Sequence, residues 1–284
     1  MLHLTDIPSL RTWTREQRTA GRAIGFVPTM GALHEGHLRL LDEARKRAGR
    51  VVMSVFVNPL QFSANEDLSK YPRDLERDST LADRRGVDLL FAPTVQTMYP
   101  EGAETRVSPG PTASYWEGAV RPGHFTGVLT VVTKLFNLVQ PDIAVFGQKD
   151  IQQYTLIRKM VKDLDLPVEL VMVPTVREAD GLAMSSRNVY LDKSQRADAA
   201  LISAGLRAAH QAWTKGERDV NALEAFVKAA LARSGAIKVD YIATVEPERL
   251  TPAGTAGAGT ILCVAVRVGT TRLIDNMIYG QGVP

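Results

Sequence analysis

Short apolar runs recur along the first part of the chain, and each is bounded by glycine, proline or asparagine. They are five to seven residues long and rich in β-branched residues, which is typical of strands buried on both faces. The runs are 23–27 (AIGFV), 51–57 (VVMSVFV), 87–92 (VDLLFA), 142–147 (DIAVFG) and 168–173 (VELVMV). This spacing predicts a parallel sheet with connecting segments long enough for helices.

Helical patterns lie between these runs, as apolar positions three and four residues apart. One stripe consists of Leu38, Leu41, Ala44 and Ala48, and another of Phe125, Val128, Val132, Leu135 and Val139. Strands that alternate with helices are typical of βαβ units, whose crossover helices cover both faces of a sheet. The pattern therefore predicts that residues 1–176 form an α/β domain with a doubly wound, Rossmann-like parallel sheet.

The pattern changes after Val176. Residues 176–192 (VREADGLAMSSRNVYLD) are polar and irregular, and the chain then offers two helical stretches followed by two strands. The helices are expected at 193–213 and 220–233, and the strands at 238–245 and 260–268. Helices followed by strands, without alternation, favour a separate fold class. We therefore expect residues 177–284 to form a smaller α+β domain that acts as a lid over the active site.

The amino-acid composition bears on the cellular compartment of the protein. The 284 residues include one cysteine, Cys263, within the apolar run ILCVAV, so no disulfide framework is possible and a buried thiol is expected. The N-terminal stretch lacks the pattern of an export signal, and no run of 18 apolar residues occurs. We therefore expect a cytoplasmic protein that does not enter a membrane.

Charge is less decisive. The net charge is +3 and the pI about 9.0, which suggests nucleic acid as a partner, but basic and acidic residues are interleaved, as in LDEARKRAGR. A mildly basic surface suits small anionic substrates equally well.

The stretch PTMGALHEGH at 28–37 carries the strongest chemical signal. It follows the first predicted strand, and ligands of open parallel sheets bind beyond the carboxyl ends of strands, where helix N-termini attract anions. His34 and His37 share a helix face, while Gly31 and Gly36 allow a close backbone approach. This arrangement suits a polyphosphate. Zinc is disfavoured because H-E-x-x-H sites need histidines four residues apart, but a capping histidine beside a surface histidine stays open for this stretch alone.

Two further loops offer positive charge and hydroxyls. Lys149, in GQKD at 147–150, follows the fourth predicted strand and would lie at the same edge of the sheet as the histidines. Ser185, Ser186 and Arg187, in MSSR at 184–187, follow the last parallel strand, and the guanidinium could hold a phosphate. Each loop taken singly is also compatible with an ordinary solvated turn.

Together these motifs carry a family resemblance over nearly the whole chain. They are FVPTMGALHEGH, VFVNPLQF, YPRDLERD, RPGHFTGV, LFNLVQPDIAVFGQKDIQQY and VPTVREADGLAMSSRNVYL. In this order they resemble the pantothenate synthetase (pantoate:β-alanine ligase) family. That family belongs to the nucleotidyltransferase superfamily with a HIGH-type histidine motif, which includes class I aminoacyl-tRNA synthetases.

The resemblance implies an AMP-forming ligase. It implies that pantoate and ATP form a pantoyl adenylate and release pyrophosphate, and that β-alanine then attacks to give pantothenate and AMP, a step towards coenzyme A. It further implies a homodimer formed through the N-terminal domain, with neither nucleic acid nor membrane as a partner. The motifs contain no activated covalent nucleophile, as expected where the substrates supply the reacting atoms.

The resemblance also assigns residues. It places His34 and His37 on the phosphates, with His37 as proton donor, and Lys149 with Ser185, Ser186 and Arg187 around the departing pyrophosphate. Gln61 and Gln153 are the pantoate pair. The ATP-binding residues are Met30, Gly31, Ala32, Leu33, His34, Glu35, Gly36, His37, Gly147, Gln148, Lys149, Asp150, Val176, Met184, Ser185, Ser186 and Arg187. Among these, Gly147 and Asp150 would hold the ribose and Val176 and Met184 the adenine.

Mg²⁺ is expected to arrive with ATP, and no metal site built by the protein is assigned. Asp78 is the nearest candidate carboxylate, but its place in YPRDLERD favours a surface helix residue.

Two other functions remain in view. A transferase that moves AMP onto a phosphorylated acceptor is disfavoured by Gln61 and Gln153, since a phosphate acceptor would call for arginine or lysine. A nucleic-acid-binding module is suggested by the pI and the histidine motif, but the sequence lacks a basic stripe and an aromatic stacking platform.

Overall fold

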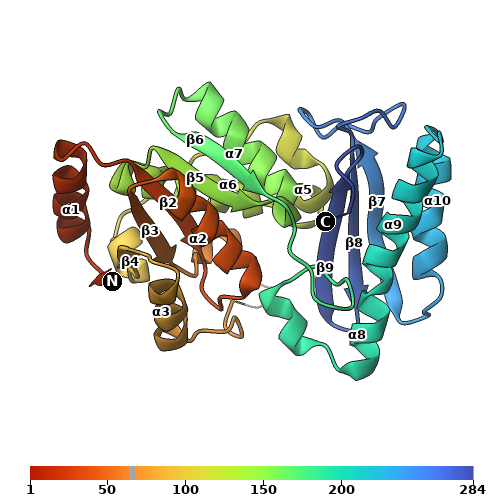
Figure 1. Ribbon diagram of the computed structural model, residues 1–284, viewed down its shortest axis with the longest axis horizontal. Coiled ribbons are helices and arrows are strands. Elements are labelled where there is room, and N and C mark those ends of the chain that lie inside the picture. The colour runs from red at the N-terminus through yellow and green to blue at the C-terminus, as the bar shows by residue number, and fades with distance from the viewer. Residues whose placement is uncertain (64–67, 284) are drawn as a thin grey trace. The chain divides into compact units, whose positions relative to one another are not determined.

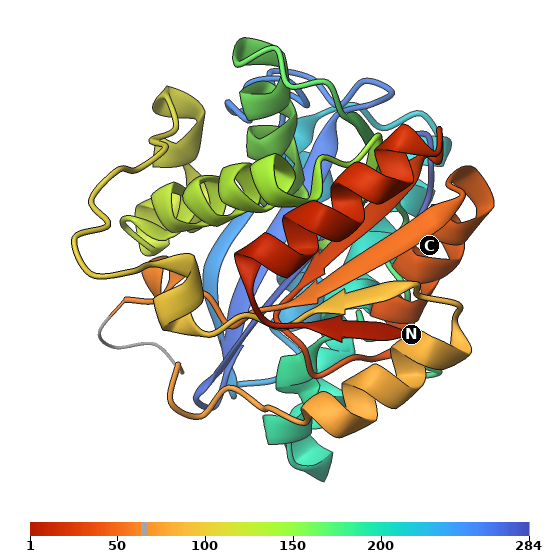
Figure 2. The same cartoon turned by 90° about the vertical axis from the view of Figure 1, so that its left-hand side faces the viewer.

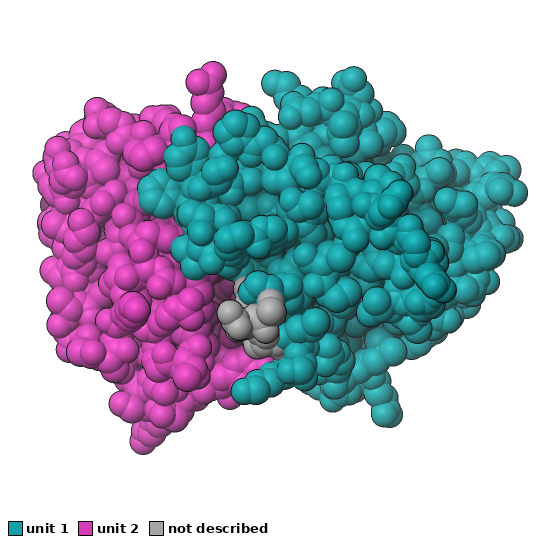
Figure 3. Space-filling view, turned by 180° about the vertical axis from the view of Figure 1, so that it is seen from behind, with its two compact units in different colours: residues 1–147, 152–173 teal, residues 148–151, 174–284 magenta. Residues whose placement is uncertain are grey.

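The computed structural model describes residues 1–63 and 68–283. The chain divides into two compact units, coloured separately in Figure 3. The first unit comprises residues 1–147 and 152–173, and the second comprises 148–151 and 174–284. The second unit thus takes in Gln148–Ile151, which the sequence analysis assigned to the first domain.

Within the described residues, the first unit holds a six-stranded sheet in which every pairing is parallel. The strand order is β1-β4-β3-β2-β5-β6 (Figure 1). The strands are β1 (Leu2–Leu4), β2 (Ile24–Thr29), β3 (Arg50–Val55), β4 (Leu89–Phe91), β5 (Ile143–Gly147) and β6 (Glu169–Val173). The five predicted strands are confirmed. Strand β1 was missed because its three residues are mostly exposed and form no apolar run.

Helices cover both faces of this sheet, which confirms the doubly wound α/β class. The helices of this unit are α1 (Ile7–Thr19), α2 (Glu35–Arg47), α3 (Leu75–Arg84), α4 (Val95–Met98), α5 (Trp116–Val120), α6 (His124–Val139) and α7 (Ile151–Asp163). Helices α1 and α6 lie side by side along one face (Figure 2). The two predicted stripes supply the contacts: Leu41 of α2 is buried against one face and Val132 of α6 against the other.

Strand β2 is the topological switch point of the sheet. From β2 the chain proceeds outwards through β3 and β4 on one side and, later, through β5 and β6 on the other. The loops that leave β2 and β5 therefore lead to helices on opposite faces, and ligands of such sheets bind beyond the carboxyl ends of the strands at this point. Gly25 of β2 pairs with Ile143 of β5, so the two strands at the switch point are direct neighbours.

The second unit is α+β, as predicted. Its antiparallel sheet has the order β7-β8-β9, and its helices pack on one side of that sheet around Leu206, Val227 and Val264. The elements are α8 (Lys193–Ala199), α9 (Leu201–Thr214), α10 (Val220–Leu231), β7 (Ile237–Val245), β8 (Ile261–Val268) and β9 (Thr271–Ile278). The sequence predicted two strands. Strand β9 was missed because the adjacent polar residues Asp275 and Asn276 interrupt its apolar pattern.

Cys263 is buried in β8, as expected. Among the described residues, no helix combines the length and apolar composition needed to cross a membrane.

Candidate functional site

The histidine loop, residues 30–34, joins the end of β2 to the start of α2. Gly31 and Ala32 both adopt left-handed backbone conformations, with φ of 84° and 52°. A side chain at residue 31 would also collide, since a Cβ there would lie 2.9 Å from Asp78 Oδ2 and 3.0 Å from Val55 Cγ1. Glycine is therefore required at this position both for its backbone conformation and for the space.

Asp78 holds the backbone of the histidine loop through hydrogen bonds. Its two carboxylate oxygens accept from the backbone N–H groups of Ala32 and Leu33, each at 2.8 Å. The residue is 1% exposed, so the interpretation of Asp78 as a surface helix residue is wrong. The sequence was misleading here because a charged side chain is rarely buried, and the partners that permit burial are backbone groups.

Burial raises the pKa of Asp78 above the usual aspartate value, although the two backbone hydrogen bonds and the nearby Arg77 act in the opposite direction. Arg77 Nη1 lies 3.7 Å from Asp78 Oδ1 and donates to Leu33 O at 3.0 Å. The histidine loop is thus fixed by a buried anion whose ionised form is disfavoured by desolvation.

The two histidines lie together at the N-terminus of α2. His34 is the N-cap and His37 the third helical residue, and their ring centroids are 4.1 Å apart with planes tilted by 37°. The His34 backbone N–H donates to His37 Nδ1 at 3.3 Å. A ring nitrogen that accepts carries no proton, so neutral His37 bears its proton on Nε2. His37 is therefore arranged as a donor through Nε2.

Glu35, the first residue of α2, differs from the two histidines beside it. Its carboxylate pairs with Arg85 Nη2 at 3.2 Å. Its side chain is thereby engaged with the residue that follows α3, and only its backbone remains for the helix N-terminus.

Gln61 meets the histidine loop within the same unit. It lies in the short helix η1 (Pro59–Gln61) after β3, is 9% exposed, and its Nε2 donates to Met30 Sδ at 3.2 Å. Gln153 lies in the first turn of α7, which follows β5. The two predicted pantoate residues thus come from the segments after the two strands that flank β2.

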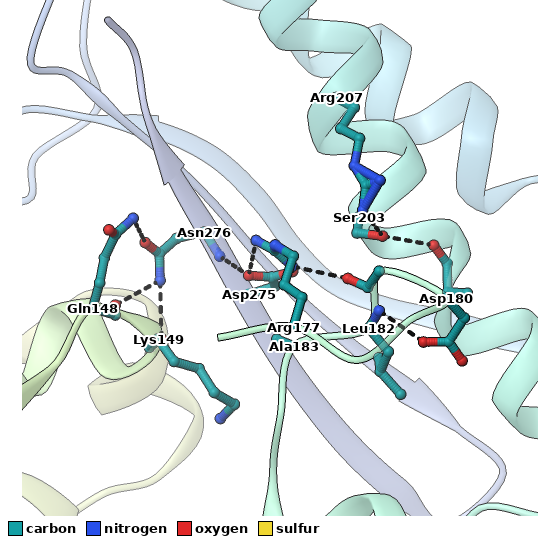
Figure 4. A network of polar contacts seen from close by, with 12 residues as sticks. Gln148, Lys149, Arg177, Asp180, Leu182, Ala183, Ser203, Arg207, Asp275 and Asn276 are labelled. Carbon is teal, nitrogen blue, oxygen red and sulfur yellow. Dashed lines mark hydrogen bonds and ion pairs between the residues drawn. The ribbon is translucent and has the colours of Figure 1, made fainter. Parts of the chain in front are cut away.

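The Lys149 turn, η3 (Gln148–Asp150), is held by Asn276 of β9 within the second unit (Figure 4). Asn276 Nδ2 donates to Gln148 O at 3.0 Å and to Lys149 O at 2.9 Å. Its Oδ1 accepts from Gln148 Nε2 at 3.2 Å, so the buried Gln148 amide serves the turn itself. The Lys149 side chain extends away from Asn276 (Figure 4), with Nζ 3.8 Å from Asp150 Oδ1.

A tight hairpin over residues 176–184 precedes the serine and arginine residues. Met184 N donates to Val176 O at 2.9 Å, which brings the two predicted adenine residues together. The hairpin is anchored to β9 by Arg177, whose guanidinium binds Asp275 through Nη1 at 2.6 Å and Nη2 at 3.1 Å (Figure 4). Both side chains are almost fully buried.

Beyond the hairpin, Ser185 caps the short helix η4 (Ser186–Tyr190) and accepts from Arg187 N at 3.2 Å. The three residues Ser185–Arg187 therefore share one turn.

The predicted residues form one set in each unit. The first set contains Met30, Gly31, Ala32, Leu33, His34, Glu35, Gly36, His37, Gln61, Gly147 and Gln153, and the second contains Gln148, Lys149, Asp150, Val176, Met184, Ser185, Ser186 and Arg187.

Four residues that support the predicted ones were not identified from the sequence. Asp275 and Asn276 are described above, Asn58 donates to Gln61 Oε1, and Tyr99 donates to Asn58. Asp275 and Asn276 could have been recognised in the sequence, because adjacent polar residues inside the apolar run TRLIDNMIYG are unusual unless both are hydrogen-bonded. Asn58 lies in VFVNPLQF, where asparagine before proline indicates only a turn. Tyr99 had no signal, since its partner is 41 residues away.

Comparisons with known proteins show the family of the chain. Residues 3–278 match the family described as pantoate-beta-alanine ligase. The pantothenate synthetase of Heliobacterium modesticaldum is 51% identical over 275 residues, covering 97% of this chain and 98% of that protein. That of Agrobacterium fabrum is 51% identical over 276 residues, covering 97% and 94%.

Two solved structures extend the comparison. The pantothenate synthetase of Thermus thermophilus is 50% identical with a TM-score of 0.94, covering 98% of this chain and 99% of that one. The pantoate-beta-alanine ligase of Francisella tularensis, solved with beta-gamma ATP and β-alanine, is 33% identical with a TM-score of 0.82 over 100% of both chains. The chain belongs to the pantoate-beta-alanine ligase family and is a ligase.

Proposed function

We propose that the chain condenses (R)-pantoate with β-alanine in an ATP-driven reaction that passes through a pantoyl adenylate. A carboxylate oxygen of pantoate attacks the α-phosphorus of ATP, and the bond to the pyrophosphate oxygen breaks. The β-alanine amine then attacks the acyl carbon, the bond to the AMP oxygen breaks, and the amine loses a proton. The products are pantothenate, AMP and pyrophosphate.

The observation that carries the proposal is the paired imidazoles at the N-terminus of α2, beside the switch point of the sheet. Their ring centroids lie 4.1 Å apart, and the hydrogen bond from the His34 N–H leaves His37 Nε2 to donate. Donors at a helix N-terminus suit a phosphate chain whose negative charge grows as pyrophosphate leaves. The ATP compound and β-alanine bound to the Francisella tularensis relative support the same substrates.

The remaining roles are those that the family resemblance implies, and the chemistry of the residues is compatible with them. Lys149, Ser185, Ser186 and Arg187 are proposed to stabilise the departing pyrophosphate, and the 30–37 and 147–150 segments with Val176 and Met184 to bind ATP. Gln61 and Gln153 are proposed to bind pantoate, because neutral amides orient a carboxylate without adding charge that would weaken the nucleophile. The protein contributes position and charge stabilisation, and the substrates supply the reacting atoms.

Mg²⁺ enters this proposal as part of the ATP substrate. We do not assign Asp78 as a ligand, because it is 1% exposed and its oxygens hold the backbone of the histidine loop. Among the described residues, no group of three or more histidine, cysteine, aspartate or glutamate residues has the geometry to hold a metal ion. We therefore assign no protein ligand to Mg²⁺ and derive no step through it.

The homodimer formed through the first unit, the cytoplasmic location and the lid role of the second unit stay predictions.

Isotope exchange tests the order of steps. Labelled pyrophosphate is expected to exchange into ATP with pantoate present and β-alanine absent, because adenylate formation is reversible and needs only the first two substrates. The reverse combination should give no exchange. Exchange that strictly requires β-alanine, or release of ADP in place of AMP, would contradict the pantoyl-adenylate mechanism.

A further inference from the structure

A chain of hydrogen bonds runs from the half-buried Tyr99 through the buried Asn58 to Gln61. The Tyr99 hydroxyl donates to Asn58 Oδ1 at 2.9 Å, and Asn58 Nδ2 donates to Gln61 Oε1 at 3.1 Å. Gln61 Nε2 then donates to Met30 Sδ. Asn58 is 1% exposed, so its hydrogen bonds are made to protein groups rather than to bulk water. The three side chains lie between the end of α4 and the histidine loop, in the first unit.

Backbone groups fix the direction of this chain. The two ends of an amide side chain have nearly the same shape, so the partners must decide which is oxygen. Leu60 N, which can only donate, lies 3.3 Å from Asn58 Oδ1. Gly127 O, which can only accept, lies 3.1 Å from Asn58 Nδ2. Asn58 must therefore present its NH₂ group to Gln61, and Gln61 must answer with its oxygen.

The opposite end of Gln61 is thereby a donor. Its NH₂ group meets a thioether sulfur, which is a weak acceptor. A substrate oxygen is a much stronger acceptor and would replace the sulfur at little cost to the protein. Tyr99 must act as a donor to match, and burial raises its pKa to about 12, with Arg106 acting in the opposite direction. The hydroxyl thus keeps its proton at physiological pH.

Close packing holds the backbone of Gln61 in place as well. A Cβ at Gly127 would lie 2.2 Å from Leu60 O, so α6 meets η1 backbone to backbone. His124 Nδ1 lies 2.8 Å from Gln61 O and must donate to it, because a carbonyl can only accept. Neither the side-chain amide nor the backbone of Gln61 can rotate without breaking one of these contacts.

We propose that Tyr99 is a positioning residue that acts through Asn58 to hold Gln61 with its NH₂ group towards an acceptor oxygen of the acid substrate. The inference rests on the proposed function, in which Gln61 binds pantoate.

A double-mutant cycle tests the role of Tyr99. Tyr99→Phe keeps the ring, and Asn58 Oδ1 keeps Leu60 N, so the fold is expected to survive. The KM for pantoate should rise roughly threefold to tenfold, as for the loss of one hydrogen bond, while the KM values for ATP and β-alanine stay unchanged. In a Gln61→Ala background the same substitution should have no further effect on pantoate. Tyr279→Phe, which removes another buried hydroxyl in the second unit, serves as the control.

The outcomes separate the two claims. If Gln61→Ala raises the KM for pantoate but Tyr99→Phe has no effect, or an effect that multiplies independently, the positioning role fails while the substrate role of Gln61 stands. If Gln61→Ala leaves the KM for pantoate unchanged, the proposed substrate role fails and the inference falls with it.

Gln61→Glu tests the direction of the hydrogen bonds. One carboxylate oxygen would still accept from Asn58, and the other would place negative charge where the substrate acid binds. Pantoate binding should therefore be weaker in Gln61→Glu than in Gln61→Ala. A KM for pantoate near that of the unaltered protein would overturn the inference, because it would mean that Gln61 accepts from the substrate.

Discussion

Two loops present the candidate phosphate-binding groups, and the backbone of each is held by a buried side chain of a different kind. The histidine loop is held by a carboxylate, Asp78, which accepts from two backbone N–H groups. The Lys149 turn is held by a neutral amide, Asn276, which donates to two backbone carbonyls. One support titrates and the other does not.

In the proposed function both loops bind an anionic ligand, and the difference between their supports suits that role. A turn that offers an ammonium group to phosphates should direct its carbonyl oxygens elsewhere, and Asn276 binds them. The histidine loop offers side-chain donors to the ligand, so two of its backbone N–H groups can bind within the protein. A carboxylate is the acceptor best suited to two N–H groups. A buried anion makes this loop the more pH-sensitive of the two.

The largest expected effect comes from removing the groups that the two loops present. His37→Ala and, separately, Lys149→Ala should each lower kcat by roughly a hundredfold to a thousandfold, because donors aimed at developing charge act mainly in the transition state. Steady-state kinetics with pantoate and ATP varied in turn measures this. His3→Ala and Lys46→Ala, on the surface, are the matched controls. Normal kcat with only a raised KM would contradict both roles.

The strand patterns and the helix start were enough to predict that the histidines follow β2 and that Lys149 follows β5. Their supports could not be predicted. Asp78 lies in α3 one turn before the buried Ala82, but nothing in the sequence shows that backbone N–H groups 45 and 46 residues away satisfy its charge. Strand β9 was missed for the same reason: Asp275 and Asn276 are polar because they bind Arg177 and Gln148, and sequence patterns contain no such long-range partners.

Reversing the polarity of the neutral support should have the next largest effect. Asn276→Asp would set a carboxylate, which has no donor when ionised, against the carbonyls of Gln148 and Lys149. We expect a loss of roughly 2 to 3 kcal/mol in the free energy of unfolding, more than for Asn276→Ala, and a lower kcat as the turn shifts. Urea denaturation measures the first and steady-state kinetics the second. Asn137→Asp, on an exposed face of α6, is the control; equal stability of the two Asp variants would show that Asn276 does not support the turn.

Neutralising the charged support should separate activity from stability. In Asp78→Asn, one of the two loop N–H groups faces an amide NH₂ group in place of an oxygen, so the loop loses one hydrogen bond. We expect kcat to fall roughly tenfold, because the histidines are less well placed. The free energy of unfolding should change much less than in Asn276→Asp, since the substitution also removes a desolvated charge. Asp83→Asn, exposed on the same helix, is the control. A large loss of stability with normal kcat would show that Asp78 supports the fold rather than the loop.

The smallest expected effect is a change in how stability depends on pH, and its sign follows from the raised pKa of Asp78. Because the folded-state pKa lies above the unfolded value, the folded protein binds the proton more tightly, so this group favours folding at low pH. That contribution is lost as pH rises through the folded-state pKa. Asp78→Asn removes the titration, so its stability relative to the unaltered protein should improve as pH rises from the usual aspartate pKa of 3.8 through the folded-state pKa, and should stay constant above it. Unfolding free energies of the two proteins across that range give the slope, which is insensitive to the constant cost of the lost hydrogen bond. The same comparison for Asn276→Ala should be flat, and a slope of opposite sign for Asp78→Asn would mean that hydrogen bonds from Ala32 and Leu33 outweigh desolvation.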